Sequence, residues 1–255
     1  MGHLTPAPKI VCGIVCGMAS EARALGRWAD DPLVGIGISG ARPGRAEVEA
    51  RRLVAEGCRV LLSWGVAGGL DPALVPGDLV FPAEVLAEDG GSWPLSQELG
   101  AALAAGVPSL RRGFAGDPGP SGARQAPEKG QGGGRHILGL DRMVLTVAEK
   151  AALFERTGAV AVDMESHRVA LVAAAAGLPV LAVRAIGDPA GRALPALAAR
   201  ALGEDGRPRI GPVAAGLLRR PGDLAALLRV KRDTEAALAA LAAVAETLIL
   251  AILPR

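Results

Sequence analysis

The sequence is poor in aromatic residues and in cysteine. It has no tyrosine and only three phenylalanines and three tryptophans among 255 residues, while glycine and proline number 35 and 19. We interpret this imbalance as a coding bias of the genome rather than as a sign of function. The three cysteines, Cys12, Cys16 and Cys58, are odd in number and lie in or beside apolar runs. They support neither a disulfide framework nor a zinc site, and we expect buried thiols in a reducing compartment.

The chain also has no excess of charge of either sign. Its 28 basic and 26 acidic side chains give a formal net charge of +2, and the two signs are interspersed. No field therefore selects nucleic acid as a partner. Half of the residues are hydrophobic, which is ample for a core. We expect a single domain over residues 1–255, in which residues 111–135, rich in glycine, proline and charge, form a flexible insert.

An export signal is not apparent either. Residues 10–19 have the length of a signal-peptide core, but Lys9 is the only positive side chain just upstream. Glu21 and Arg23 follow where a cleavage site needs small neutral residues. We therefore interpret residues 9–16 as a first strand and expect a cytoplasmic protein.

Apolar runs that alternate with amphipathic segments predict an α/β protein. Strands are expected at residues 9–16, 33–38, 60–64, 79–85, 136–140, 159–162 and 179–186, and helices at residues 22–28, 46–56, 147–156 and 166–176. The run GVAGG at residues 65–69 is expected to be a loop. Its backbone N–H groups could approach an oxygen-rich ligand, or its glycines could make a tight turn.

Residues 213–255 are expected to close the chain with helices at residues 217–232 and 234–253. The second is nearly long enough to cross a bilayer, but Glu235 and Glu246 favour a buried or subunit-interface helix. The first carries basic side chains beside repeated leucines. It could be a solvated helix face or could rest on an anionic membrane surface.

Carboxylates gather where two of the apolar runs end. Asp163 and Glu165 follow residues 159–162, and Asp188 follows residues 179–186, in what we interpret as a β-α-β unit. Ligands of open parallel sheets lie outside the carboxyl ends of the strands. Asp163 could instead cap the next helix, and Asp188 could form an Asp-Pro turn. Burial would raise the pKa of Asp188 and suit it to general acid catalysis.

Glu21 is a further candidate near the carboxyl end of a strand. It follows residues 9–16 directly, in the turn before the helix at residues 22–28. The helix dipole favours glutamate in a first turn, so a purely structural role is the alternative.

Five short motifs occur in a particular order: GMASE at residues 17–21, SWGVAGGL at 63–70, PGDLV at 76–80, VDMES at 162–166 and RAIGDP at 184–189. Together they resemble the nucleoside phosphorylase and nucleosidase superfamily, and within it the 5′-methylthioadenosine/S-adenosylhomocysteine nucleosidase branch. The resemblance implies a three-layer α/β fold with a central mixed sheet flanked by helices. It also implies a homodimer that uses no metal and no organic cofactor.

The resemblance implies a role for individual residues in breaking a purine N-glycosidic bond. Asp188 matches the acid that protonates the leaving purine at N7, and Glu21 matches the base that activates water. Glu165 matches the carboxylate that binds the ribose hydroxyls, and Met164 the apolar residue beneath the ribose. The water or phosphate site would include Arg184 and Gly68, and the base pocket would include Met143, Val144 and Val66.

A carboxylate at the nucleophile position would repel phosphate, which favours hydrolysis over phosphorolysis. Arg23, Arg42 and Arg45 come from the same region and could still hold phosphate. A phosphate-dependent purine nucleoside phosphorylase is therefore one alternative, and a 5′-methylthioadenosine/S-adenosylhomocysteine nucleosidase is another. A non-catalytic nucleoside-binding protein follows them.

Three further segments look like the hopanoid-associated members of the superfamily: SHRVA at residues 166–170, DPAGRALP at 188–195 and LLRRPGDLAALLRVKRD at 217–233. This likeness implies a lipid-linked substrate, adenosylhopane, from which adenine is removed to leave ribosylhopane, and peripheral contact with the inner membrane surface. Gly187, Arg42 and Met143 stand where the family usually has a serine, a glycine and an aromatic residue. These departures point away from ordinary small nucleosides as substrates.

Overall fold

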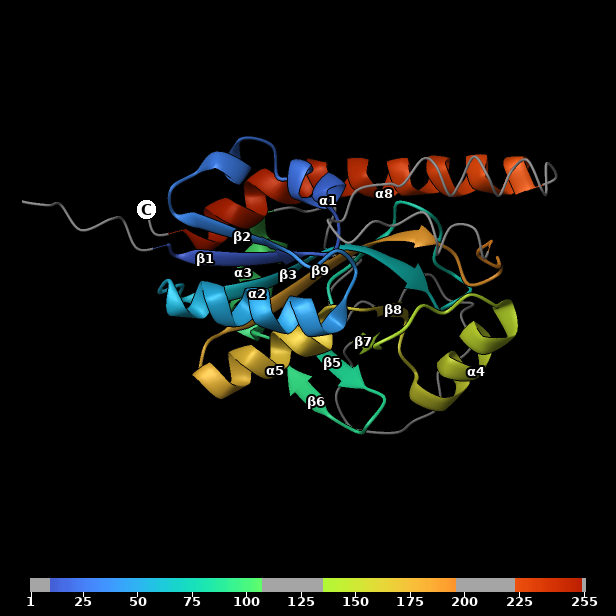
Figure 1. Cartoon of the computed structure of the whole chain (residues 1–255), viewed down its shortest axis with the longest axis horizontal. Helices are drawn as coiled ribbons and strands as arrows, with labels where there is room; N and C mark the ends of the chain where they lie inside the picture. The colour runs from blue at the N-terminus through green and yellow to red at the C-terminus, as the bar shows by residue number, and fades with distance from the viewer. Residues whose placement is uncertain (1–9, 107–134, 196–222, 254–255) are drawn as a thin grey trace, which may run out of the picture.

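A nine-stranded mixed sheet with helices on both faces forms the centre of the molecule (Figure 1). The computed structural model describes residues 10–106, 135–195 and 223–253. Lys9, residues 111–134 of the expected insert and residues 213–222 of the expected C-terminal helices lie outside these ranges. The strand order is β2-β1-β3-β8-β7-β5-β6, and β9 pairs with β3 and β4. This arrangement confirms the mixed α/β sheet that the sequence predicts.

The first half of the sheet is parallel. It consists of β1 (Cys12–Cys16), β2 (Val34–Ile38), β3 (Val60–Gly69) and β9 (Val180–Asp188). Side chains alternate between two cores, as a strand period of two requires. Ile14, Leu62 and Val183 belong to one core, and Leu61 and Ala182 belong to the other.

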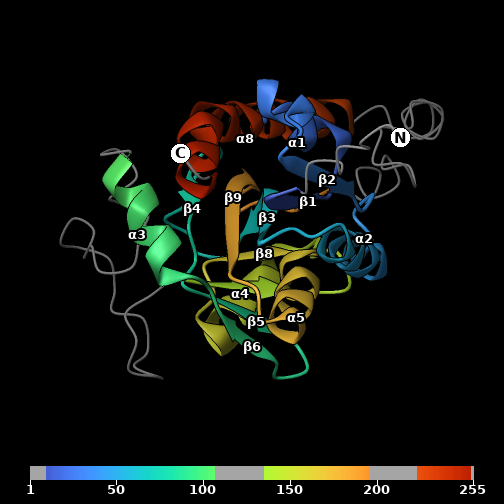
Figure 2. The same ribbon diagram turned by 90° about the vertical axis from the view of Figure 1, so that its left-hand side faces the viewer.

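Helices cover both of these faces (Figure 2). The first core is closed by α8 (Asp223–Ile252), with α1 (Ala19–Arg23) and a 3₁₀ turn, η1 (Gly26–Asp30), beside it. The second core is closed by α2 (Pro43–Ala55) and α5 (Ser166–Ala176). The α5 helix occupies the residues that the sequence predicts. The α2 helix begins three residues earlier than expected, because Pro43 fits the first helical position.

The second half of the sheet contains the short strands. They are β4 (Leu79–Val80), β5 (Glu84–Ala87), β6 (Ser92–Pro94), β7 (His136–Gly139) and β8 (Ala161–Asp163). The expected strand at residues 79–85 is therefore divided, because β4 pairs with β9 while β5 pairs with β6 and β7. Two further helices are α3 (Gln97–Gly106) and α4 (Val147–Thr157).

The strand directions correct the expected β-α-β unit. The β9 strand runs parallel to β3, but β8 runs antiparallel to β3, with Gly68 opposite Val162. The two strands that flank α5 therefore do not form a parallel pair. Their carboxyl ends still come together, because β8 pairs only with the last two residues of β3 and Asp188 lies opposite Gly68 in the same region.

The glycine run at residues 65–69 is part of β3 and not the loop that we expected. It stays extended because it pairs with β9 as far as Gly68, with one irregularity between Ala67 and Gly68. The predicted helix at residues 22–28 is also wrong: it is divided between α1 and η1. Ala24 and Leu25 separate the two, and Gly26, the first residue of η1, has a φ of +59° in the left-handed region that favours glycine.

From residue 223 onward, the two predicted C-terminal helices are one continuous helix, α8, which Asp233 does not interrupt. By length and composition alone, Leu224–Ile252 could cross a membrane, but 39% of its most apolar window is already buried inside the protein. The buried residues recur at helical spacing: Ala237, Leu241, Val244, Ala245, Leu248, Ile249 and Ile252. They pack in the first core with β1, β3 and β9, so this face of α8 is a core helix face.

Substitutions on α8 test that assignment. Leu241 is fully buried, so Leu241→Ala should lower the free energy of unfolding by about 2–5 kcal/mol through lost contacts and a cavity. Leu228 lies on the same helix but is 57% exposed, so Leu228→Ala should change stability little. Urea denaturation of both variants measures the difference. Equal, small effects would show that α8 does not contribute to the core.

Candidate active site

A cavity of about 520 Å³ lies where β1, β3, β8 and β9 end. Its other walls come from the segment after β7 and from α8. Eight residues that the sequence singles out line it: Glu21, Val66, Gly68, Met143, Val144, Met164, Glu165 and Asp188. The structure therefore brings together side chains from motifs that are more than a hundred residues apart.

Glu21 is held in place by the backbone. It is the third residue of α1, and its Oε2 accepts a hydrogen bond of 2.7 Å from the N–H of Met18, the residue that caps the helix. Its Oε1 accepts a bond of 2.8 Å from the N–H of Val66 in β3. Burial raises the pKa of the Glu21 carboxyl, although these N–H donors and the charge of Arg184 oppose the rise. The residue is thus both a first-turn glutamate and part of the cavity wall.

Glu165 immediately precedes α5 and is almost fully buried, with 6% of its surface exposed. Its Oε1 accepts a hydrogen bond of 3.2 Å from the hydroxyl of Ser39. Burial and the neighbouring carboxyl of Asp163 raise the pKa of Glu165 to about 8, and Glu21 adds to this effect while Arg184 opposes it. Proton uptake and release at Glu165 therefore fall close to neutral pH.

Two glycines allow these carboxyl groups to lie so close to the backbone. A Cβ on Gly17 would lie 2.9 Å from Oε1 of Glu165 and 3.2 Å from Oε2 of Glu21. A Cβ on Gly65 would lie 2.7 Å from the Glu21 carboxyl carbon. Side chains at these positions would displace the glutamates, which explains why glycine follows both β1 and the first half of β3.

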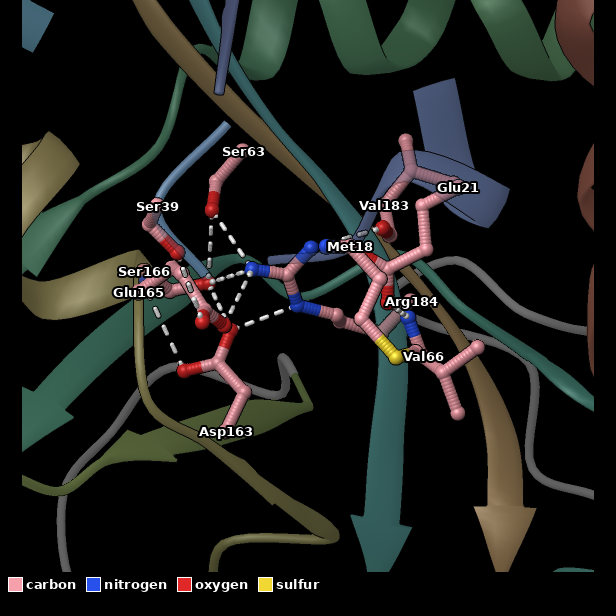
Figure 3. Close-up of polar contacts among 10 residues, drawn as sticks. All are labelled: Met18, Glu21, Ser39, Ser63, Val66, Asp163, Glu165, Ser166, Val183 and Arg184. Carbon is pink, nitrogen blue, oxygen red and sulfur yellow. Dashed lines mark hydrogen bonds and ion pairs between the residues drawn. The ribbon is translucent and has the colours of Figure 1, made fainter. Parts of the chain in front are cut away.

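Arg184 is the buried cation behind this part of the cavity (Figure 3). Its Nη2 donates to Ser63 Oγ at 2.6 Å and to Ser166 Oγ at 3.2 Å, and its Nε donates to Asp163. Nη2 also lies 3.9 Å from Oε2 of Glu165. Arg184 is fully buried and does not contribute to the cavity lining. Its expected place beside a water or phosphate stays a prediction.

Asp163 has the capping role that the sequence offered for it, and it also lines the cavity. Its Oδ1 accepts a hydrogen bond of 3.2 Å from the Ser166 N–H, so it does cap the first turn of α5. Its Oδ2 binds both Arg184 and the hydroxyl of Ser166. Asp163 therefore connects the helix start to the buried cation.

Asp188 is the last residue of β9 and contributes to a separate wall of the cavity. Its Oδ2 lies 2.6 Å from the ammonium of Lys150, which is fully buried in α4. Burial raises the pKa of the Asp188 carboxyl, and the hydrogen bond and charge of Lys150 oppose that rise. The pKa of Asp188 is thus shifted in the direction that the sequence predicts. Asp188 is also more than part of an Asp-Pro turn at the surface, because it pairs with the buried Lys150.

The base pocket predicted from the sequence is made of apolar side chains. Val66, Met143 and Val144 all border the cavity. Gly187 packs closely against Val66, because a Cβ at position 187 would lie only 2.4 Å from Val66 Cγ1. The side chain of Val66 therefore explains why position 187 has a glycine, where the resemblance leads us to expect a serine.

Sequence reasoning missed a residue behind the cavity wall and one whole wall of the cavity. One is Lys150, which looks like a surface lysine beside Glu149 but lies on the apolar side of α4 with Leu153 three residues later. That spacing was the available signal. The other is a wall from α8, made by Leu227, Val230, Lys231, Thr234, Glu235 and Leu238. Only the folded chain brings this segment to the carboxylates.

Comparison with known proteins gives a family match and two close curated relatives. Residues 33–220 match the family model of the phosphorylase superfamily. A stretch of 157 residues is 33% identical to the 5′-methylthioadenosine/S-adenosylhomocysteine nucleosidases of Mycobacterium bovis and Mycobacterium tuberculosis. The alignment covers 53% of this chain and 61% of each relative, which is less than two thirds of their length.

Solved structures resemble the whole described fold. The futalosine hydrolase of Helicobacter pylori superposes with a TM-score of 0.63 and 16% identity, over 94% of this chain and 97% of that one. The 5′-methylthioadenosine/S-adenosylhomocysteine nucleosidase of Neisseria meningitidis gives a TM-score of 0.63 and 15% identity, over 95% and 99%. At such identities the likeness shows the fold alone, and it confirms the expected three-layer architecture.

Removing the buried cation should destabilise the protein in a pH-dependent way. Arg184→Met leaves Asp163, Glu165 and Glu21 without their shared counter-ion, so the free energy of unfolding at pH 8 should fall by about 3–5 kcal/mol. The loss should shrink at pH 5, because Glu165, whose pKa is raised to about 8, is then protonated and no longer needs a counter-ion. Urea denaturation at both pH values measures this, with exposed Arg51→Met as the control. A loss that is independent of pH would contradict the electrostatic explanation.

Proposed function

Because the chain belongs to the phosphorylase superfamily, we propose that it hydrolyses the N-glycosidic bond of an adenosyl substrate and releases adenine. The observation that carries the proposal is the grouping of Glu21, Glu165 and Asp188 around one cavity, each with a pKa raised by burial. Such grouped, perturbed carboxyls in a cleft are typical of acid–base sites. The activity named for the mycobacterial relatives supports the same reaction class.

Asp188 supplies the proton to the departing base in this proposal. As the bond between the ribose and the purine breaks, its electron pair moves to the base, which becomes a better leaving group when N7 is protonated. A carboxyl with a raised pKa retains a proton closer to neutral pH than an exposed aspartate does. The apolar side chains of Val66, Met143 and Val144 would hold the adenine ring next to it.

Glu165 and Glu21 act on the sugar. The ribose gains positive charge as the base leaves, and the carboxylate of Glu165 stabilises that charge while it accepts hydrogen bonds from the two ribose hydroxyls. Those hydrogen bonds favour its ionised form and draw its pKa down from about 8 when substrate binds. Met164 lies beneath the ribose. Glu21, ionised, takes a proton from the water that attacks the cationic sugar.

Hydrolysis is supported over phosphorolysis by the charges of the cavity. Arg184, the cation nearest to Glu165, already binds Asp163, Ser63 and Ser166. A phosphate dianion near Glu21 and Glu165 would meet two buried carboxyls. Phosphorolysis is the second candidate, because Arg23 also lines the cavity. A binding protein without turnover is a weaker candidate, since the complete acid–base set is present.

The α8 wall supports a substrate with a large apolar group at the ribose 5′ position. Leu227, Val230 and Leu238 add apolar surface to the cavity beyond the three carboxyls. Adenosylhopane, which would yield ribosylhopane, is the substrate that we propose. The exposed Leu224 and Leu228 lie on α8 beside Arg229, Lys231 and Arg232, and this combination suits peripheral contact with an anionic membrane surface. A cytoplasmic homodimer stays a prediction.

The reaction is tested with Asp188→Asn. Loss of the proton donor should reduce adenine release by about 10²–10⁴-fold while circular dichroism and thermal unfolding stay close to wild type. The exposed Asp89→Asn variant is the control. Mass spectrometry of the products in buffers with and without phosphate distinguishes hydrolysis from phosphorolysis. Full activity of Asp188→Asn would remove the proposed acid, and a phosphoribosyl product that requires phosphate would establish the second candidate.

Adjacent leucines on α8 test the substrate class. Leu227 lines the cavity and Leu228 does not, so Leu227→Ser should lower kcat/KM for adenosylhopane about tenfold or more through lost apolar contact, and Leu228→Ser should not. Turnover of 5′-methylthioadenosine should be almost unaffected by either change. Adenine release from both substrates, measured by chromatography, gives the comparison. Equal effects of the two variants on adenosylhopane, or no turnover of it by the wild type, would count against the lipid substrate.

A further inference from the structure

Lys150 is a fully buried cation whose donors are all used. Its Nζ lies 2.6 Å from Asp188 Oδ2, 2.9 Å from the carbonyl oxygen of Pro189 and 2.8 Å from that of Arg192. An ammonium group has three N–H donors, which matches these three acceptors. Lys150 thus binds both the side chain of the proposed acid and the backbone that follows it.

The position of Lys150 is set by α4. Thr146 caps this helix by accepting a hydrogen bond from the N–H of Glu149, and Lys150 and Leu153 are the buried residues of the helix. A buried charge without partners is strongly unfavourable. A fully buried lysine whose ammonium lies against one carboxyl therefore points to a task at that partner.

We propose that Lys150 is a positioning residue for Asp188: it binds Oδ2, so that the transferable proton resides on Oδ1, the oxygen left for the departing base. The inference rests on the proposed function, in which Asp188 is the acid. A proton on Oδ2 would point at a cation that can only donate. Lys150 therefore distinguishes the two oxygens and fixes the orientation of the carboxyl group.

Lys150 also prepares Asp188 for the charge that forms during the reaction. The proton leaves Oδ1 for the base nitrogen, the glycosidic electron pair goes to the base, and the aspartate becomes a carboxylate. Lys150 keeps its own protons and stabilises this anion. Burial alone would make Asp188 a very weak acid, and the hydrogen bond from Lys150 is the largest opposing influence on its pKa. The balance leaves a carboxyl whose pKa lies above the usual aspartate value and that can still release its proton.

Other charges near Asp188 act more weakly or from further around the cavity. Arg192 also lowers the pKa of Asp188, but its guanidinium pairs with Asp233 of α8. The remaining charged residues that line the cavity are Glu21, Arg23, Arg142, Asp163, Glu165, Lys231 and Glu235. Lys150 Nζ binds Asp188 and the carbonyl oxygens of Pro189 and Arg192 rather than these lining residues, so variants of Lys150 act most directly on Asp188.

The test is the pH profile of kcat/KM for adenine release by the full chain. Activity should fall as pH rises through the pKa of Asp188, because the acid loses its proton. Lys150→Gln retains N–H donors for the backbone but removes the charge. We expect its kcat/KM to fall about 10- to 100-fold, less than the roughly 10²–10⁴-fold that a general acid supplies. We also expect the alkaline limb of its pH profile, which is the pH range in which kcat/KM falls, to move up by about one pH unit or more.

Two controls separate charge from packing. Lys150→Arg keeps a cation, so its alkaline limb should stay near that of the wild type even if its rate falls. Leu153→Ala removes the buried neighbour on the same helix, and it should lower stability without moving the limb. An unmoved limb in Lys150→Gln, with Asp188→Asn inactive, would overturn the Lys150 inference alone. An active Asp188→Asn would overturn the proposed function and this inference with it.

A measurement on unmodified Lys150 covers the case in which its neutral variants do not fold. The Nζ of a buried, fully bonded ammonium should give a slowly exchanging ¹H–¹⁵N signal in the wild-type protein. That signal should shift as Asp188 titrates and should not titrate in Asp188→Asn. A Lys150 signal whose chemical shift does not change as Asp188 titrates would refute the proposed coupling between Lys150 and Asp188.

Discussion

The ion pairing of the buried Arg184 with its neighbouring carboxyls is the interaction on which the rest of the site depends. One guanidinium, fully buried, is surrounded by Asp163, Glu165 and Glu21, and these carboxyls hold its pKa above the usual value although burial lowers it. A single cation is less than three carboxylates require. Burial is the main cause that raises the pKa of Glu21 and of Glu165, and the charge of Asp163 adds to it for Glu165, so these carboxyls bind protons at higher pH than exposed glutamates do.

The site consists of two halves, each with a buried cation. Arg184 binds Ser63, Ser166 and Asp163 behind the ends of β3 and β8. Lys150 binds Asp188 and two backbone carbonyls at the end of β9. Both cations are therefore tied to groups of the protein itself, and the positions of Asp163 and Asp188 depend on them.

The sequence predicts the local parts of this design well and the long-range parts poorly. The α5 helix was located correctly because Gly177 and helical spacing are local signals, and Asp188 was recognised because a carboxylate ends an apolar run. The antiparallel direction of β8 depends on its partner β3, far away in the chain. The glycine run of β3 looks like a loop until its pairing with β9 is known. Lys150 and the α8 wall required the folded chain, because their partners lie 38 or more residues away.

The α8 helix lies wholly outside the matched family segment, which ends at residue 220, yet it forms one wall of the cavity. Glu165 and Asp188 lie within that segment, whereas Glu21 lies before it. Substitutions in the terminal helix would change the cavity wall around a substituent without replacing any of the three carboxyls, so this wall and the carboxyl residues are separable targets for variation.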